Sequence, residues 1–225
     1  EVLLGSSNVS NIPWQSIGDR FKTAELFGKL ANIFADLPSK AIDDNGLFKS
    51  ITGEDFITGE RKNKTPFFFK PYARLLFSCN EIPRNYGDKS DGFYRKLIII
   101  RFDKSVSANK RDANLREKLT VERNGILLWA IDGLKRVIAN DYKFNETEKT
   151  KAELLRYKID SNSVLSFVEE VCEIKADAEI SRDELFTKYK EYCNNAGFRP
   201  VSQTNFNKEI EGLDKNIQRN LEKLS

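Results

Sequence analysis

Three polar side chains stand where a phosphate-transfer reaction could use them. Asp36 follows an apolar run at residues 30–35, Asn80 follows a second run at residues 74–79, and Arg95 precedes a third at residues 96–102. A carboxylate can hold Mg²⁺, an amide can orient water or contact a γ-phosphate, and an arginine can stabilise developing negative charge. Each also has an ordinary explanation: Asp and Asn often end strands in turns, and an exposed Arg can form a salt bridge.

A second group of residues could contact nucleic acid. Arg61, Lys62, Asn63 and Lys64 lie between two apolar stretches, within residues 59–66, and three phenylalanines follow at once. This pattern predicts a hairpin with a basic tip, and cations at an exposed tip can bind phosphates. The alternative is a solvated turn.

The elements around these residues indicate an α/β fold. The three apolar runs are continuous rather than alternating, which favours strands buried on both faces of a largely parallel sheet. Residues 111–140 repeat apolar side chains at helical spacing, and residues 146–158 favour a second helix. Strand ends of a parallel sheet share one edge, so we expect Asp36 and Asn80 to lie at the same edge.

The last part of the chain predicts a small helical domain after a polar boundary at residues 160–163. Val164 begins an apolar helix face, Ser181 and Glu184 form a capping box, and Gly197 is a plausible helix stop. Ser202 or Thr204 could cap a third helix, and residues 217–221 could form a terminal strand or wing. Three helices and a wing are typical of helix-turn-helix domains.

The third of these helices carries residues that could read base edges, namely Gln203, Asn205, Asn207 and Lys208. Residues 161–225 nevertheless carry a net charge of −3, whereas residues 1–160 carry +6. An acidic balance opposes phosphate binding, so a protein-docking or structural role is the alternative for this domain.

Composition narrows the class of protein. Apolar residues make up 40% and charged residues 32%, with no apolar run long enough to span a membrane and no signal peptide. Three dispersed cysteines and no histidine argue against a disulfide framework and a structural zinc. We therefore expect a cytoplasmic protein without a membrane partner.

Four segments in order resemble the phage and plasmid primase–helicases of helicase superfamily 3, within the AAA+ class. Residues 28–38 look like their Walker B region, and residues 52–62 resemble the motif that follows it. Residues 77–83 are similar to their sensor 1, and residues 90–97 to their arginine-finger segment. The end of the chain resembles their C-terminal winged-helix domain, through residues 184–186, Tyr192, Cys193 and Gly197.

The resemblance implies a partial AAA+ core at residues 1–140, a helical linker at 141–160 and a winged-helix domain at 161–225. It implies part of a hexameric, ATP-dependent DNA helicase that moves along DNA during replication of a mobile element, with a primase domain or another replication protein as a further partner. Asp36 would serve Mg²⁺ through ATP, Asn80 would act as sensor, and Arg95 would reach the neighbouring subunit's ATP. Residues 61–64 would project into the DNA channel.

Two departures from the family pattern bear on activity. No G-x-x-x-x-G-K-[S/T] loop occurs in the 225 residues, and the chain contains no Met, so we expect a piece of a longer protein that binds ATP poorly alone. Asp36 is flanked by Ala35 and Leu37, where two adjacent acids are usual. The alternative function is therefore a non-catalytic DNA-binding or assembly protein that keeps an AAA+ scaffold.

Overall fold

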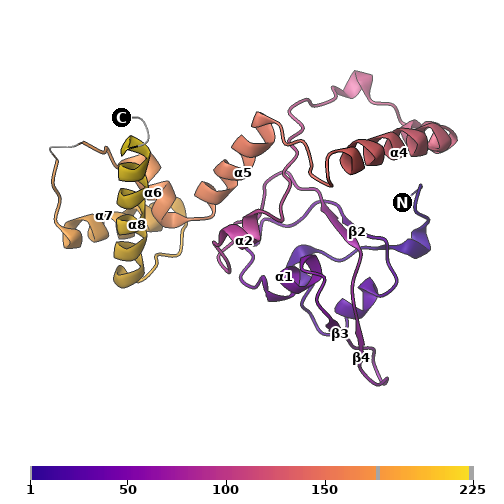
Figure 1. The fold of residues 1–225 in the computed structure, drawn as a ribbon, viewed down its shortest axis with the longest axis horizontal. Coiled ribbons are helices and arrows are strands. Elements are labelled where there is room, and N and C mark those ends of the chain that lie inside the picture. The colour runs from indigo at the N-terminus through magenta and orange to yellow at the C-terminus, as the bar shows by residue number, and fades with distance from the viewer. Residues whose placement is uncertain (1, 176–177, 223–225) are drawn as a thin grey trace. The chain divides into compact units, whose positions relative to one another are not determined.

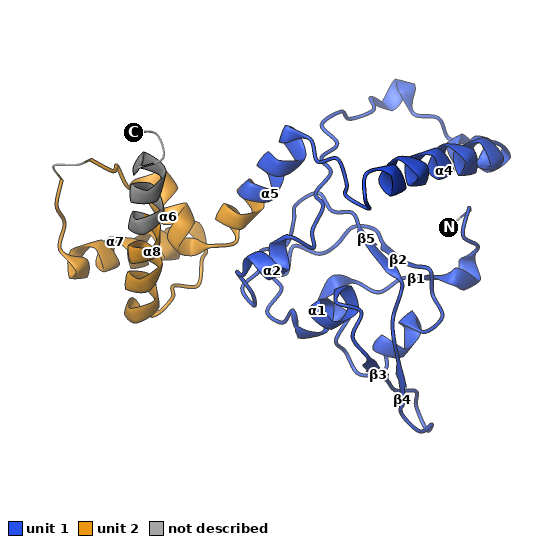
Figure 2. Ribbon diagram, viewed as in Figure 1, with its two compact units in different colours: residues 1–155 blue, residues 156–225 orange. Residues whose placement is uncertain are grey.

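The chain is a mixed α/β protein with two compact units, residues 1–155 and residues 156–225 (Figures 1 and 2). The computed structural model describes the backbone of residues 2–175 and 178–222 and, apart from residues 176–177, the side chains up to residue 213. Eight α-helices and five short strands occur within these residues. None of the helices in this part of the chain is both long and apolar enough to cross a membrane.

A three-stranded parallel sheet organises unit 1. Its order is β1 (Val9–Ser10), β2 (Ala31–Phe34) and β5 (Arg74–Phe77). Ala31 of β2 lies opposite Arg74, and Phe34 lies opposite Phe77. The two strands predicted from the first two apolar runs are therefore confirmed. The prediction that both faces are buried is wrong for β5, whose side chains alternate between exposed and half-buried.

An antiparallel hairpin joins β3 (Ile57–Gly59) to β4 (Phe67–Phe69), which confirms the predicted hairpin. Gly59 lies opposite Phe67, and a Cβ at position 59 would lie 2.7 Å from the Phe67 ring. Only glycine therefore leaves room for that ring to lie across the strand pair. On β4, Phe67 and Phe69 share one side, while Phe68 points to the other and is 74% exposed.

Aromatic side chains form the core of unit 1. The Trp14 ring, in the 3₁₀ turn Trp14–Ser16, stacks on Phe48 at 4.7 Å and on Phe77 at 5.5 Å. Phe93 is fully buried and lies 5.5 Å from Phe48. This cluster joins β5 to α1 (Gly46–Thr52) and α2 (Asp91–Tyr94).

Two helices near the end of unit 1 are exposed. The predicted helical stretch 111–140 forms two helices, α3 (Leu115–Val121) and α4 (Arg123–Ala139), which meet at Glu122. Neither buries a side chain within the described part of the chain, and Trp129 is 72% exposed. A further helix, α5 (Glu148–Asp160), confirms the helix predicted at 146–158.

The strand predicted at residues 96–102 is wrong. These residues form no strand and no ladder with any described residue, and Phe102 is 89% exposed. An apolar run can become a strand only where another strand offers its edge, and the run itself carries no information about that partner.

Unit 2 packs α6 (Ser163–Val171), α7 (Arg182–Ala196) and α8 (Gln203–Glu222) around Phe167, Tyr189 and Phe206. The predicted caps are confirmed: Glu184 N donates to Ser181 Oγ, Gly197 ends α7 with a φ of 68°, and Asn205 N donates to Ser202 Oγ. The predicted terminal strand or wing is wrong, because residues 217–221 continue α8. Helical hydrogen bonding continued from the preceding turns satisfies this backbone without a strand partner.

Candidate functional site

Asp36 and Asn80 lie at the same edge of the parallel sheet. Pairing of β2 with β5 continues beyond their last ladder pair, since Ser78 N donates to the Phe34 carbonyl at 3.0 Å. Leu37 N then donates to the Ser78 carbonyl at 2.9 Å. Asp36 and Asn80 therefore leave the sheet from adjacent strands, and both are exposed. Such an edge is where open α/β sheets bind ligands.

The Asp36 backbone adopts the left-handed conformation, with a φ of 54°. Asp and Asn tolerate this region better than most residues. Within the described part of the chain, no side chain or backbone group bonds to the Asp36 carboxylate. Mg²⁺ bound together with phosphates needs only one or two carboxylates, because phosphates and water supply the other ligands. One accessible carboxylate at a strand end therefore fits that ion.

Arg95 is exposed directly after α2, and two contacts fix that helix. Phe93 is buried in the aromatic core, and its backbone N–H donates to Ser90 Oγ at 3.3 Å. The Arg95 side chain has no hydrogen-bond or ion-pair partner among the described residues, and it contacts neither Asp36 nor Asn80. The structure thus presents Arg95 outward instead of joining it to the sheet edge.

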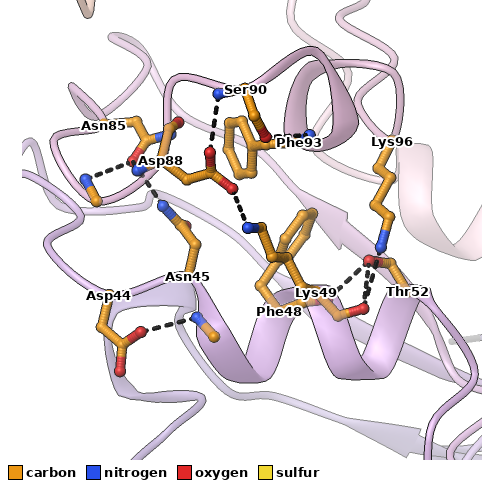
Figure 3. Close-up of polar contacts among 12 residues, drawn as sticks. Asp44, Asn45, Phe48, Lys49, Thr52, Asn85, Asp88, Ser90, Phe93 and Lys96 are labelled. Carbon is orange, nitrogen blue, oxygen red and sulfur yellow. Dashed lines mark hydrogen bonds and ion pairs between the residues drawn. The ribbon is translucent and has the colours of Figure 1, made fainter.

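A buried amide network fixes the loop before α2, and Figure 3 shows its members. Asn85 is fully buried, and its Oδ1 accepts from Asn45 Nδ2 at 2.6 Å and from Gly87 N at 3.0 Å. Its Nδ2 donates to the Asp88 carbonyl at 2.6 Å. The amino-acid sequence does not predict this network, whose only local signal is the N-x-G-D turn composition at residues 85–88.

The loop is also bound to α1 by charge. Lys49 of α1 pairs with the Asp88 carboxylate, and Ser90 N donates to Asp88 Oδ1 at 2.8 Å (Figure 3). Partial burial alone would raise the pKa of Asp88, but the hydrogen bonds from Lys49 and Ser90 outweigh it and lower that pKa. Lys96 Nζ adds a bond to the Lys49 carbonyl at 3.0 Å, beyond α2. Arg95 therefore follows a helix whose flanking segments, before and after it, are both bonded to α1.

The basic residues gather at the hairpin tip as predicted from their position between the strands. Lys64 N donates to the Arg61 carbonyl at 3.0 Å, and Asn63 takes the left-handed conformation that closes the turn, with a φ of 58°. Arg61, Lys62, Asn63 and Lys64 are all exposed. The Arg61 guanidinium lies 5.2 Å from the Phe67 ring centre. No carboxylate within the described residues pairs with Arg61, Lys62 or Lys64, so their charge is available to an anion.

The predicted base-reading residues of unit 2 do not share one face of α8. Successive residues of a helix are about 100° apart, so Gln203 and Asn207 lie on one side and Asn205 and Lys208 on another. Gln203 Nε2 already donates to Asp183 Oδ1 of α7 at 2.7 Å. The side next to Asn207 also carries Glu211, which pairs with Arg182.

Two family models match separate parts of the chain. Residues 1–96 match a family of unknown function, DUF5906, and residues 159–220 match the family "Poxvirus D5 protein-like". A curated relative, named "Putative helicase", comes from Acanthamoeba polyphaga mimivirus. It is 33% identical over an alignment of 107 positions, and the match covers 39% of this chain and 11% of that protein. The chain thus spans about a tenth of that relative's length, and each family match falls within one of the two units.

Proposed function

We propose that this chain forms part of an ATP-driven DNA helicase of superfamily 3, with an AAA+ core in unit 1, acting in replication of a virus or other mobile element in the host cytoplasm. The observation that carries the proposal is the common sheet edge at which Asp36 and Asn80 leave adjacent parallel strands. The similarity to a viral protein named as a helicase and to the poxvirus D5-like family supports the same class.

In this proposal each side chain at the edge has a distinct task. Asp36 would hold Mg²⁺ together with the phosphates of ATP, and that ion would neutralise charge on the transferred phosphoryl group. Asn80 would orient the attacking water or contact the γ-phosphate from the next strand. A phosphate-binding loop elsewhere in the complete protein would hold the remaining phosphate oxygens.

Arg95 would act on the ATP of a neighbouring subunit in a ring, which we propose to be a hexamer. Its outward position, the absence of a partner among the described residues and the fixed helix α2 support a role at a subunit boundary. A guanidinium placed against the γ-phosphate stabilises the charge that develops during transfer.

The test uses DNA-stimulated ATP hydrolysis by the complete protein that contains this chain. Asp36→Asn removes the negative charge and keeps a residue type that tolerates the left-handed backbone conformation at this position. Arg95→Ala removes the guanidinium. Each should lower kcat by at least about 100-fold. The matched controls Asp19→Asn and Arg116→Ala, both at exposed positions of unit 1, should keep wild-type rates. Wild-type activity in both site variants would refute the proposal.

A mixing experiment tests the role of Arg95 across subunits. Rings assembled from equal amounts of the Asp36→Asn and Arg95→Ala proteins contain some interfaces with both intact residues. Activity should therefore reappear on mixing, although each variant is inactive alone. Failure to recover any activity would place Arg95 in its own subunit's site.

A second candidate, a non-catalytic DNA-binding or assembly protein with the same scaffold, is favoured by one observation. The position after Asp36, where a second acid would be expected, holds Leu37, which is 8% exposed and belongs to the core. This candidate predicts DNA binding by the complete protein without any ATP hydrolysis.

For unit 2 we propose a three-helix domain, related to winged-helix domains but with α8 where the wing was expected, that is used for protein docking or for structure. The dispersed positions of Gln203, Asn205, Asn207 and Lys208 around α8 support this role over base reading, and so does the bond of Gln203 to Asp183. In the full chain, Lys208→Glu should accordingly change the protein's affinity for duplex DNA by no more than about twofold, as measured by fluorescence anisotropy. A loss of tenfold or more would instead assign α8 to DNA.

A further inference from the structure

An open hollow of about 580 Å³ lies beside the hairpin in unit 1, at the end where the tip begins. It is lined by residues from the end of β1, from the turn before β2 and from the hairpin. Its exposed aromatic side chains are Phe21 and Phe27, and its cations are Lys29, Arg61 and Lys62.

The apolar wall of the hollow is an aromatic group that is packed on one side and open on the other. The Phe27 ring lies nearly perpendicular to Phe67 and Phe69, with ring centres 5.1 Å and 5.4 Å away. These contacts hold the ring, yet Phe27 remains 50% exposed. Gly28 follows with a φ of +72°, so the chain turns sharply there and Phe27 stays at the rim of the hollow.

The charged wall of the hollow has an excess of cations. Its two carboxylates are neutralised at short range, since Glu60 pairs with Arg20 at 2.8 Å and Glu25 pairs with Lys22 at 3.0 Å. Arg61 and Lys62 have no carboxylate partner in the part of the chain that the structure describes. The Arg61 guanidinium lies 6.0 Å from the Phe27 ring centre, so a positive charge borders the aromatic surface.

We propose that this hollow binds one unpaired nucleotide of a single-stranded nucleic acid, with its base against Phe27 and its phosphate at Arg61 and Lys62. The inference rests on the proposed function and assigns a strand type and a contact mode to its hairpin. Aromatic rings beside cations are how proteins hold single strands, because any unpaired base offers a π-face and the backbone offers phosphate. In a duplex both faces of each base are already stacked, so the aromatic wall selects single strands.

The experiment compares two strands of equal length and charge, dT₁₂ and a twelve-unit strand with abasic sites, by fluorescence anisotropy with the full chain. The wild-type protein should bind dT₁₂ at least about fivefold more tightly, since base stacking on one aromatic side chain contributes about 5- to 100-fold. Phe27→Leu should remove this preference and leave the affinity for the abasic strand unchanged. Lys62→Ala should weaken both strands equally.

Phe68→Leu is the matched control, because Phe68 lies on the same hairpin but faces the other side and is 74% exposed. It should keep the wild-type preference, and circular dichroism should show that all variants are folded.

Equal binding of both strands by the wild-type protein would overturn the base contact and leave the proposed function standing. A lost preference in Phe68→Leu would equally overturn it. No binding of either strand would overturn the hairpin's role in the proposed function as well, and rU₁₂ in place of dT₁₂ shows whether DNA or RNA is preferred.

Discussion

At the scale of single residues, the buried hydroxyl of Tyr189 links three parts of unit 2. It shares a hydrogen bond of 2.7 Å with Ser163 Oγ of α6 and accepts one of 2.9 Å from Val201 N, which precedes α8. Burial raises the pKa of Tyr189 to about 12. The neutral hydroxyl is therefore part of what holds the three helices together.

This pKa predicts a limit on alkaline stability. Because the folded value lies above the unfolded value of about 10, the stabilisation is complete below pH 10 and is lost as pH rises towards 12. Tyr189→Phe should lower the stability of unit 2 by about 1–3 kcal/mol at neutral pH and make it less sensitive to pH above 10. Urea unfolding at pH 8 and pH 11, followed by circular dichroism, measures both effects. An unchanged pH dependence in the variant would contradict the assignment.

Gly59 allows a second prediction at this scale. Gly59→Ala would force the Phe67 ring to move, because the new Cβ would lie 2.7 Å from it. Overpacking of this kind costs about 1–3 kcal/mol, so the melting temperature should fall. Gly18→Ala is the control, because no atom lies within 4 Å of its new Cβ and the position is exposed. Equal melting temperatures for the two variants would show that Phe67 relaxes freely.

The sequence was informative about residues whose position depends on neighbours along the chain. Asp36 and Asn80 could be placed at one edge because each directly follows an apolar run. Asn45 and Asn85 could not be paired in this way, since 40 residues separate them and neither belongs to a periodic pattern. Long-range amide contacts of this kind leave no local trace in a single sequence.

At the scale of elements, the loop before α2 depends on one amide. Asn85→Ala would leave Asn45 Nδ2, Gly87 N and the Asp88 carbonyl without their partner, at a cost of about 1–3 kcal/mol. Hydrogen exchange should show faster exchange at Gly87 and Asp88 in this variant. Asn80→Ala is the control, because Asn80 is exposed and should change stability by less than about 0.5 kcal/mol. Unchanged exchange in Asn85→Ala would show that Lys49 and Asp88 suffice to hold the loop.

The helices and strands also show why part of the fold could not be predicted from the sequence. Periodicity predicted the helices well, since a helix satisfies its own backbone. The strand expected at residues 96–102 failed because a strand needs a neighbour. The same limit applies to α4, whose spacing suggests a buried face although the described residues provide no element that covers it.

At the scale of the whole molecule, each unit has its own aromatic core. Trp14, Phe48, Phe77 and Phe93 serve unit 1, and Phe167, Tyr189 and Phe206 serve unit 2. Both tryptophans of the chain, Trp14 and Trp129, belong to unit 1. Tryptophan fluorescence therefore reports on unit 1 alone.

This distribution predicts separable unfolding. Phe167→Ala removes a fully buried ring at a cost of about 3–5 kcal/mol, which is comparable to the stability of a domain this small. Far-UV circular dichroism should then lose helical signal at low denaturant, while the midpoint of the tryptophan fluorescence transition stays unchanged. Phe56→Ala, at a site that is 74% exposed, serves as the control. A shift of the tryptophan transition in Phe167→Ala would mean that the two units unfold as one.

Gly87, in the loop before α2, should rarely be substituted during evolution. A Cβ at this position would run into the Asp43 carbonyl, which is backbone and cannot rotate away. A substitution at position 87 would therefore require the backbone around Asp43 and the loop around Gly87 to shift together. A Cβ at Gly125 or Gly212 would meet no atom within 4 Å. Among descendants of this protein, position 87 should stay glycine long after those two positions have diverged.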